Sequence, residues 1–457
     1  MKFTVSALLC LVASSQVAAL GTPVRRSLGT ATVSLGAAIG TPSQLGSGIL
    51  YGIPPNDDGS ASTQIPDHFY TDIGFNLGRA GGAAWGSPNR GWSFSPAEYT
   101  YRFQVTLSNY RTTRQHGGDF YLLPHDLWGI DTDGKPYPGD DGDWIYYDQF
   151  LDQLISDIKA NSMTDGLIID IWNEPDASGL FWRRTQAQYL EMWGRTYYRL
   201  RQDLPSVSLS GPATSCGPAD NNPTFTGWAE FVAQNGSIPD IYTWHALNPA
   251  LSPSTDASYF ASLRSSLGLP SKPICINEYL AYAEEGPGPV TYYLSQFERL
   301  GISGVKANWA KGEANAFALH NYLANILGPE GATSDYYGNG EFQLYKYYAS
   351  MSGERVATTP SSDGVFEVFA TRNPVKMITA ARLSTDSYTV TVTGFAAAGF
   401  TGTTVTKHAY GFEWDGVFGE VDGTVDFGTE VHTVSGDAIS FDVYPRSVNE
   451  AYAFEFS

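Results

Sequence analysis

The chain has 457 residues, with 47 Asp and Glu against 27 Lys and Arg and a formal net charge of −20. This length accommodates a barrel-sized domain and a smaller second one, and the acidic balance disfavours nucleic acid and anionic membranes as partners. Aromatic residues make up 14% of the chain, which suits stacking on sugar rings, although most aromatic side chains in any protein belong to the core.

The first residues have the pattern of a secretory signal peptide. Lys2 precedes an apolar run over 5–12, and small residues follow as far as Ala19, so we expect residues 1–19 to be removed. The apolar run is too short to span a bilayer. Arg25 and Arg26 suggest that a propeptide, 20–26, is trimmed, although a basic N-terminal patch explains the pair nearly as well. The pattern predicts a secreted, extracellular protein.

The cysteines and one sequon leave a disulfide and a glycosylation site as possibilities. Cys10 leaves with the signal peptide, so Cys216 and Cys275 remain. In an oxidising compartment they could form one disulfide, and a buried free thiol at Cys275 is an equal alternative. Asn235 begins an Asn-Gly-Ser glycosylation sequon in a polar stretch. No metal-ligand spacing is present, and no cofactor is expected.

Short apolar runs recur along the middle of the chain. Residues 27–47 read as edge strands that pack on a second domain. Eight runs then follow, at 49–53, 75–79, 119–124, from 167, 207–211, 241–245, 274–278 and 304–309. Each precedes a loop, and most precede a helix-like stretch such as 185–204, 314–327 or 344–351. This alternation predicts an α/β fold, a parallel (β/α)8 TIM barrel over 48–351.

The pattern changes after about residue 352. Short alternating runs, separated by Gly, Asp, Ser or Asn, indicate antiparallel strands. We therefore expect an accessory β-sandwich over 352–457. Its strands are predicted at 365–370, 377–383, 388–393, 403–410, 424–427, 431–434, 438–443 and 451–456.

One predicted strand ends in an unusual way. The apolar run from Leu167 leads into Trp172-Asn173-Glu174-Pro175, and Pro175 cannot join a sheet ladder. Glu174 therefore lies at the carboxyl end of a buried strand, which is where barrel enzymes place catalytic residues. The alternative is that Glu174 caps the next helix. We disfavour it because an acid directly after an apolar strand is costly to desolvate.

A second strand ends in the same way, at Asn277-Glu278-Tyr279. Glu278 follows Glu174 by 104 residues, a gap of about three or four β/α units. Two carboxylates at the same end of one barrel are the pair that glycoside hydrolysis requires.

These motifs resemble glycoside hydrolase family 39, of the clan of retaining (β/α)8-barrel glycosidases. The resemblance rests on the 172–176 motif, on Phe181-Trp182, and on Tyr189 and Trp193 in the next helix. It covers the barrel, and it implies that Glu174 is the general acid/base and Glu278 the nucleophile. It further implies a carbohydrate substrate, most often through β-xylosidase-like exo-action.

Seven further residues at strand ends are candidates for substrate binding. The resemblance implies that Asn173 binds the sugar 2-hydroxyl and that Trp309 stacks on the sugar. Arg79 could hydrogen-bond Glu278 and keep it ionised. Each residue has a purely structural alternative. The full set is Arg79, His125, Trp128, Asn173, His245, Tyr279 and Trp309.

The finer function stays open at this point. Asn277 stands where the family's β-xylosidases usually have Thr, so the sugar is undecided. Endo-action on plant or microbial polysaccharide is an alternative to exo-action, and a non-catalytic carbohydrate-binding barrel is another. A structural cell-wall protein is disfavoured, because the chain lacks a Ser/Thr-rich stalk. The oligomeric state is not predicted.

Overall fold

The computed structural model describes residues 27–457 except 84–89, 130–134, 178, 308–321 and 331–333. The predicted signal peptide and propeptide lie outside the described residues, as do Trp309 and most of the predicted helix 314–327.

The predicted barrel is confirmed. Eight parallel strands form a closed ring, in which β2 pairs with both β3 and β9. These strands are β2 (Gly48–Leu50), β3 (Leu77–Ala80), β4 (Asp119–Leu122), β5 (Leu167–Asp170), β6 (Ser208–Thr214), β7 (Ile241–Ala246), β8 (Ile274–Tyr279) and β9 (Ser303–Lys306). The carboxyl ends of all eight strands therefore meet at one face of the barrel.

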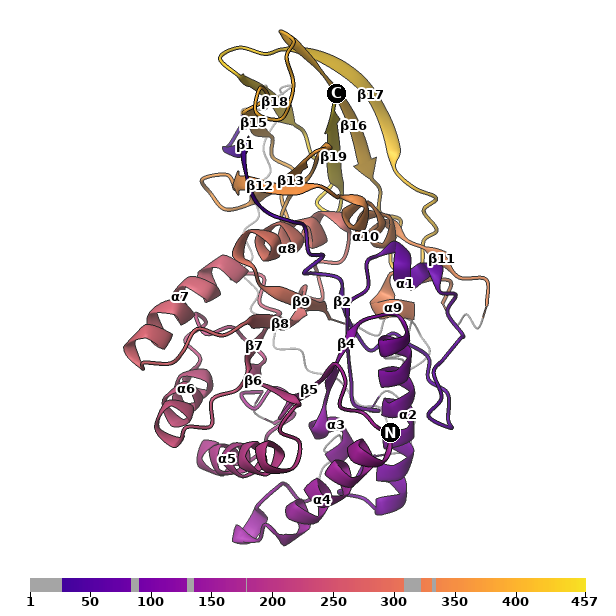
Figure 1. Cartoon of the computed structure of the whole chain (residues 1–457), viewed down its shortest axis with the longest axis vertical. Helices are drawn as coiled ribbons and strands as arrows, with labels where there is room; N and C mark the ends of the chain where they lie inside the picture. Colours follow the sequence, from indigo (N-terminus) through magenta and orange to yellow (C-terminus); the bar gives the residue numbers. More distant parts are fainter. Residues whose placement is uncertain (1–26, 84–89, 130–134, 178, 308–321, 331–333) are drawn as a thin grey trace, which may run out of the picture.

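Helices surround the ring (Figure 1). They are α1 (His68–Asp72), α2 (Pro96–Gln115), α3 (Pro124–Trp128), α4 (Ile145–Ala160), α5 (Gln186–Asp203), α6 (Pro223–Asn235), α7 (Pro253–Ser266), α8 (Pro287–Leu300), α9 (Tyr322–Asn325) and α10 (Gly340–Ser350). Three of them, α2, α6 and α7, begin with Pro. The side chain just before that Pro, of Ser95, Asn222 or Ser252 respectively, accepts a hydrogen bond from a backbone N–H of the helix. Both features fix a helix start. Among the described residues, no helix combines the length and apolar character of a membrane span.

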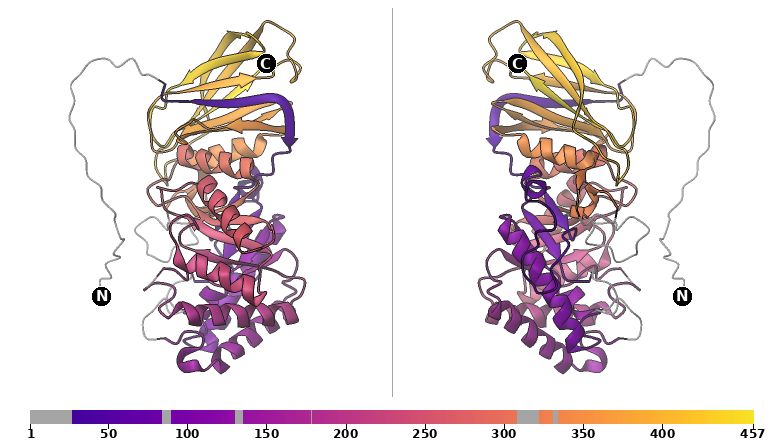
Figure 2. Two further views of the ribbon diagram at one scale, coloured as in Figure 1. Left: turned by 90° about the vertical axis from the view of Figure 1, so that its left-hand side faces the viewer. Right: turned by 90° about the vertical axis from the view of Figure 1, so that its right-hand side faces the viewer.

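The second domain is one continuous sheet of nine strands. Its strands are β1 (Thr30–Gly40), β12 (Glu354–Thr359), β13 (Phe366–Arg372), β14 (Val375–Ala381), β15 (Tyr388–Thr393), β16 (Thr404–Phe412), β17 (Val425–Thr433), β18 (Ala438–Val443) and β19 (Ala451–Phe456). The order is β17-β16-β19-β14-β13-β12-β1-β15-β18, with β1 parallel to β15 and the other pairs antiparallel. Figure 2 shows the sheet curling over itself above the barrel.

The curl places a second hydrophobic core between the arms of this sheet. Val390 and Phe441 come from one arm, and Met377 and Phe454 come from the other. The N-terminal strand β1 joins the two arms, because it lies between β12 and β15, so the edge position predicted for residues 27–47 was wrong. The accessory β-domain is thus present, with its two layers formed by a single sheet.

The strands predicted in this domain differ from the structure in two places. The runs 424–427 and 431–434 form the single strand β17, because Gly428, at φ 83°, lets the strand continue through a bulge. Strand β12 was not predicted. Its sequence is ERVATT, and only Val356 is fully buried, so little hydrophobic alternation marks it.

Helices α8 and α10 lie between the barrel and the sheet (Figure 1). All of α8 except Arg299 and Leu300 is buried, because the barrel covers one side and β13 and β14 the other. Arg299 also crosses the boundary: its two terminal nitrogens donate to the carboxylate of Glu367 on β13 at 2.7 and 2.6 Å. The two domains therefore share one buried interface.

We expect Leu35→Ala in β1 to destabilise the sheet domain. Leu35 is fully buried, and such a truncation typically costs about 2–5 kcal/mol through lost burial and the cavity left behind. Ser34→Ala, on the exposed face of the same strand, should change stability by less than about 0.5 kcal/mol. Chemical denaturation of both variants checks this. Equal midpoints would contradict the placement of β1.

Candidate active site

Glu174, His245 and Glu278 meet above the carboxyl ends of β5, β7 and β8. His245 Nδ1 lies 2.8 Å from Glu174 Oε1, and His245 Nε2 lies 3.7 Å from Glu278 Oε1. One oxygen of each carboxylate and one ring nitrogen of His245 all lie within 4.8 Å of one another. The two predicted carboxylates therefore share one site, on the fourth and seventh strands of the barrel.

Arg79, at the end of β3, donates hydrogen bonds to several residues of this site. Its Nη1 donates to Glu278 Oε1 at 2.6 Å, and its Nη2 donates to Asn173 Oδ1 at 2.8 Å. Nε and Nη2 also donate to Asp170 Oδ2, at 3.1 and 2.8 Å. Arg79 is only 1% exposed. Its planar fork of donors thus fixes three acceptors at once.

Asp170 belongs to this network and was not predicted from the sequence. It is fully buried and accepts hydrogen bonds from Ser210 Oγ at 3.0 Å and Asn277 Nδ2 at 2.7 Å, besides those from Arg79. The available signal was a lone acid inside the apolar run 167–171. A charge in a buried strand requires a partner, and Arg79 is that partner.

The two carboxyl groups differ in their surroundings. Burial, reinforced by the nearby charge of Asp176, raises the pKa of Glu174 to about 7. Burial also raises the pKa of Glu278, but His245 and Arg79 act in the opposite direction. Burial lowers the pKa of His245 to about 4, against the attraction of Glu278. At neutral pH the imidazole is therefore neutral and carries one proton, between two acidic groups.

The backbone around Glu174 is held in a rare conformation. Glu174 has φ 45°, a left-handed geometry that costs free energy in a residue other than Gly and often marks functional sites. Its N–H donates to Ala213 O at 2.8 Å. Two residues on, Asp176 accepts from Ser215 N at 2.7 Å and from Asn222 Nδ2 at 2.7 Å. The loops after β5 and β6 thus fix the position of Glu174.

A cleft of about 880 Å³ opens beside the two carboxylates. Its walls come from the loops after β5, β6 and β7, and it reaches Glu174 and Glu278. The lining residues beyond those predicted are Ala177, Leu180, Phe181, Ser215, Cys216, Leu247, Asn248, Pro249 and Ala250. No sequence motif marked the loops after β6 and β7. Volumes of this size suit small-molecule ligands.

His125 lies next to this cleft. Its Nδ1 is 2.7 Å from Asp126 Oδ1, and its ring meets Phe181, which lines the cleft, edge-on at 5.2 Å between centroids. The charge of His125 acts to lower the pKa of Glu174. Its Nε2 is buried without a partner among the described residues. Substrate contact by His125 stays a prediction.

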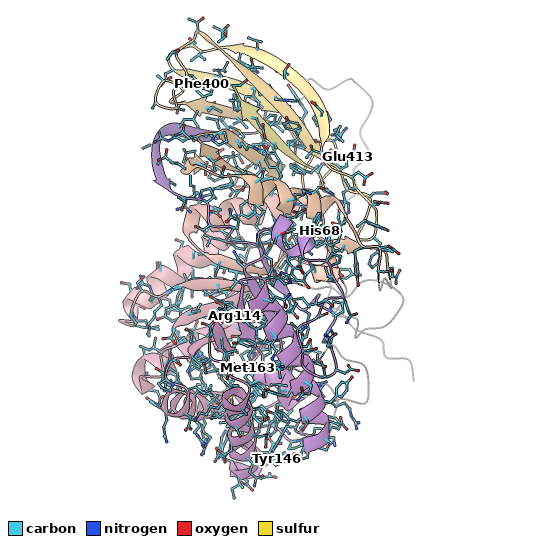
Figure 3. The ribbon with its side chains drawn as sticks, turned by 45° about the vertical axis from the view of Figure 1, so that its right-hand side comes forward. His68, Arg114, Tyr146, Met163, Phe400 and Glu413 are labelled. Atoms are coloured by element: carbon cyan, nitrogen blue, oxygen red, sulfur yellow. The ribbon has the colours of Figure 1, made fainter. Side chains whose placement is uncertain are left out.

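Two residues predicted to contact the substrate are absent from the described lining of the cleft. Trp128 is buried in the helical layer, where its ring packs on Tyr147 and Phe150 of α4 and on Tyr146, labelled in Figure 3 at the end opposite the sheet domain. Trp128 points away from the cleft because a short helix, α3, begins directly after β4.

Tyr279 also faces away from the cleft, because neighbours in a strand alternate and Glu278 points to the site. Its hydroxyl donates to Gly46 O at 2.7 Å and meets the Tyr345 hydroxyl.

Both remaining cysteines are free thiols, Cys275 buried and Cys216 at the cleft. The disulfide alternative therefore does not describe this structure. Glu174, His245 and Glu278 are also the one set of His, Cys, Asp and Glu close enough to share a metal ion within the described part of the chain. The Arg79 cation already donates to Glu278, and it would repel a metal placed there.

Sequence comparison gives no relative: no family model and no curated protein matches the chain. The fold, in contrast, has many counterparts. N2152 from Neocallimastix frontalis is 20% identical, with a TM-score of 0.73 over 94% of this chain and 99% of that one. A GH39 enzyme from Xanthomonas axonopodis pv. citri is 13% identical, with a TM-score of 0.60 over 95% and 98%.

A third structure is a monomeric beta-xylosidase from Caulobacter crescentus, 14% identical, with a TM-score of 0.56 over 94% and 99%. The chain thus shares its two-domain fold with GH39 enzymes. At these identities the likeness concerns the fold, and the activity must be argued from the site.

Burial of Glu174 predicts a pH-dependent stability. Its pKa is about 7 in the folded chain against an ordinary value of 4.5 for a Glu carboxyl, so the folded state binds more protons between these pH values. The contribution of Glu174 to stability therefore falls as pH rises through this window, by on the order of 3 kcal/mol at most. Glu174→Gln should gain stability relative to wild type between pH 5 and pH 8.

Thermal unfolding midpoints at both pH values measure this gain. Glu191→Gln, on the exposed face of α5, is the control and should show no such gain. A difference between wild type and Glu174→Gln that is the same at pH 5 and pH 8 would contradict the buried, protonated state of Glu174.

Proposed function

We propose that this protein is a secreted retaining glycoside hydrolase that cleaves plant or microbial oligosaccharide or polysaccharide. The observation that carries the proposal is the approach of Glu174 and Glu278, with one oxygen of each and a ring nitrogen of His245 mutually within 4.8 Å. Retaining enzymes place their carboxyl groups roughly 5–5.5 Å apart, whereas inverting enzymes leave about 6.5–9.5 Å for a water molecule. The short separation favours retention.

In the first step Glu278 attacks the anomeric carbon, and the bond from that carbon to the glycosidic oxygen breaks. Glu174 gives its proton to the departing oxygen. Its raised pKa, about 7, keeps it protonated for this task. The product is a glycosyl ester of Glu278 and a free leaving-group alcohol.

In the second step Glu174, now ionised, takes a proton from water as the water attacks the anomeric carbon. The ester bond to Glu278 breaks, and the carboxylate returns to Arg79 Nη1, which lies 2.6 Å from Oε1. Asn173 accepts from Arg79 through Oδ1, which leaves its amide N–H groups for a sugar hydroxyl. Both carboxyl groups regain their starting protonation.

For the substrate, we propose a β-xylosidase-like exo-glycosidase. The motif resemblance and the shared fold with the Caulobacter crescentus beta-xylosidase support this choice. Endo-action remains the alternative, because the cleft extends past Glu174 along the loops after β6 and β7. Secretion rests on the signal-peptide pattern of residues 1–19.

Glu278→Gln should lower kcat/KM by more than about 10³-fold on every substrate, because it removes the nucleophile. Glu174→Gln should do so on xylo-oligosaccharides and xylan, because their leaving sugar alcohol needs the proton of Glu174, whereas a 4-nitrophenolate leaves with little need of it. The assay uses 4-nitrophenyl β-xyloside, β-glucoside, β-galactoside and α-arabinofuranoside, together with xylo-oligosaccharides and xylan. Glu191→Gln, on the outer face of α5, should retain wild-type rates.

Cleavage of any substrate by Glu278→Gln, or undiminished cleavage of xylo-oligosaccharides by Glu174→Gln, would show that the carboxylates are wrongly assigned. Binding of a glycan without cleavage by wild type would favour the non-catalytic alternative. Release of xylose alone would indicate exo-action, and a ladder of xylo-oligosaccharides from xylan would indicate endo-action.

We expect kcat/KM to follow a bell-shaped pH profile. Activity falls above about pH 7, because Glu174 loses the proton that it must donate. The acidic limb should lie above the usual range of a Glu carboxyl, because burial raises the pKa of Glu278. A profile that stays flat from pH 6 to 9 would contradict Glu174 as the acid.

A further inference from the structure

Arg382 reaches from the sheet domain to the back of the active site. It follows β14 directly, and its backbone N–H donates to Val365 O at 2.9 Å. Its side chain is nonetheless buried against the barrel. The guanidinium lies 4.7 Å above the ring of Tyr292 and 5.2 Å above that of Tyr293, both on α8.

The guanidinium contacts two loops of the site. Nη1 donates to Leu251 O, in the loop after β7, at 2.7 Å. Nε and Nη2 donate to the carboxylate of Glu284, in the loop after β8, at 2.6 and 3.1 Å. Glu284 is fully buried. A cation from one domain therefore joins two loops that leave neighbouring strands of the other.

The first loop lines the cleft, and the second follows the strand that carries Glu278. Residues 247–250 line the cleft, and Leu251 follows them directly. Glu284 accepts from Ala281 N at 3.3 Å, three residues beyond Glu278. Tyr293, which accepts from Arg382 Nη2 at 2.8 Å, lies 3.3 Å from the carbonyl of Ala246, next to His245.

The loop after β7 has space on both of its sides. Pro249 and Ala250 line the cleft, and they also line a second groove of about 480 Å³ at the domain boundary. Packing alone therefore does not fix this loop. Asn248 Nδ2 donates to Asp220 at 3.0 Å on the side of β6, and Arg382 holds Leu251 on the side of the sheet domain.

We propose that Arg382 is a positioning residue, which holds the loop 247–252 and Glu284 so that the sheet domain sets the width of the substrate cleft. This inference rests on the proposed function. The sheet domain thereby takes part in substrate binding without contacting the substrate.

The test compares Arg382→Lys and Arg382→Met with Arg299→Met. Lys keeps a charge for Glu284, but a single nitrogen cannot reproduce the planar fork that reaches Glu284, Tyr293 and Leu251 together. Arg299→Met is the matched control, because it removes another ion pair across the domain boundary, with Glu367, and Arg299 donates to no described residue of a cleft loop.

Hydrogen–deuterium exchange of the free protein is the first measurement. Both Arg382 variants should exchange at least about tenfold faster at 247–252 and 281–285 than wild type, whereas Arg299→Met should leave these segments unchanged. Equal exchange in Arg382→Lys and wild type would overturn the proposal.

Kinetics on the fastest-cleaved 4-nitrophenyl glycoside of the panel are the second measurement. Arg382→Lys should lose about tenfold in kcat/KM, mostly through KM, and Arg299→Met should keep the wild-type KM. An unchanged KM in Arg382→Lys would overturn the proposal. Absence of any cleavage by wild type would instead contradict the proposed function, and exchange would still decide whether Arg382 holds the loops.

Discussion

The buried guanidinium of Arg79 is the interaction on which the site depends. It lies inside the barrel with almost no exposure and neutralises Asp170 while it contacts Glu278 and Asn173. Removing such a cation would leave buried carboxylates uncompensated, which is strongly destabilising. One side chain thus connects the stability of the barrel core to the ionisation of the proposed nucleophile.

The rest of the site gives two chemically identical residues, Glu174 and Glu278, different surroundings. Glu278 has Arg79 beside it, whereas Glu174 has Asp176 nearby and its carboxylate contacts His245. Burial raises the pKa of both carboxyl groups. The Arg79 cation offsets this effect by direct contact at Glu278 alone. The difference between acid and nucleophile therefore follows from placement on β3, β5 and β8 rather than from residue type.

The sequence predicts what is local to the chain. Two Asn-Glu pairs that end apolar strands mark the carboxylates, and Arg79 and His245 follow from strand-end position. Trp128 lies away from the cleft because a helix begins directly after β4, and composition does not specify where a strand passes into a helix. Tyr279 faces away because it alternates with Glu278 along β8. Asp170 reads as part of an apolar strand until its partner, 91 residues away, is placed beside it. The loop 247–252 has no motif, because its position depends on contacts from other loops and from Arg382 in the other domain.

The most direct test of a retaining mechanism is to trap the glycosyl-enzyme. The protein is incubated with an activated 2-deoxy-2-fluoro derivative of the sugar that it releases, then digested and analysed by mass spectrometry. We predict one added fluoroglycosyl group on Glu278, with loss of activity in proportion to labelling. A label on another residue, or steady turnover with inversion of the anomeric configuration and no label, would contradict the account.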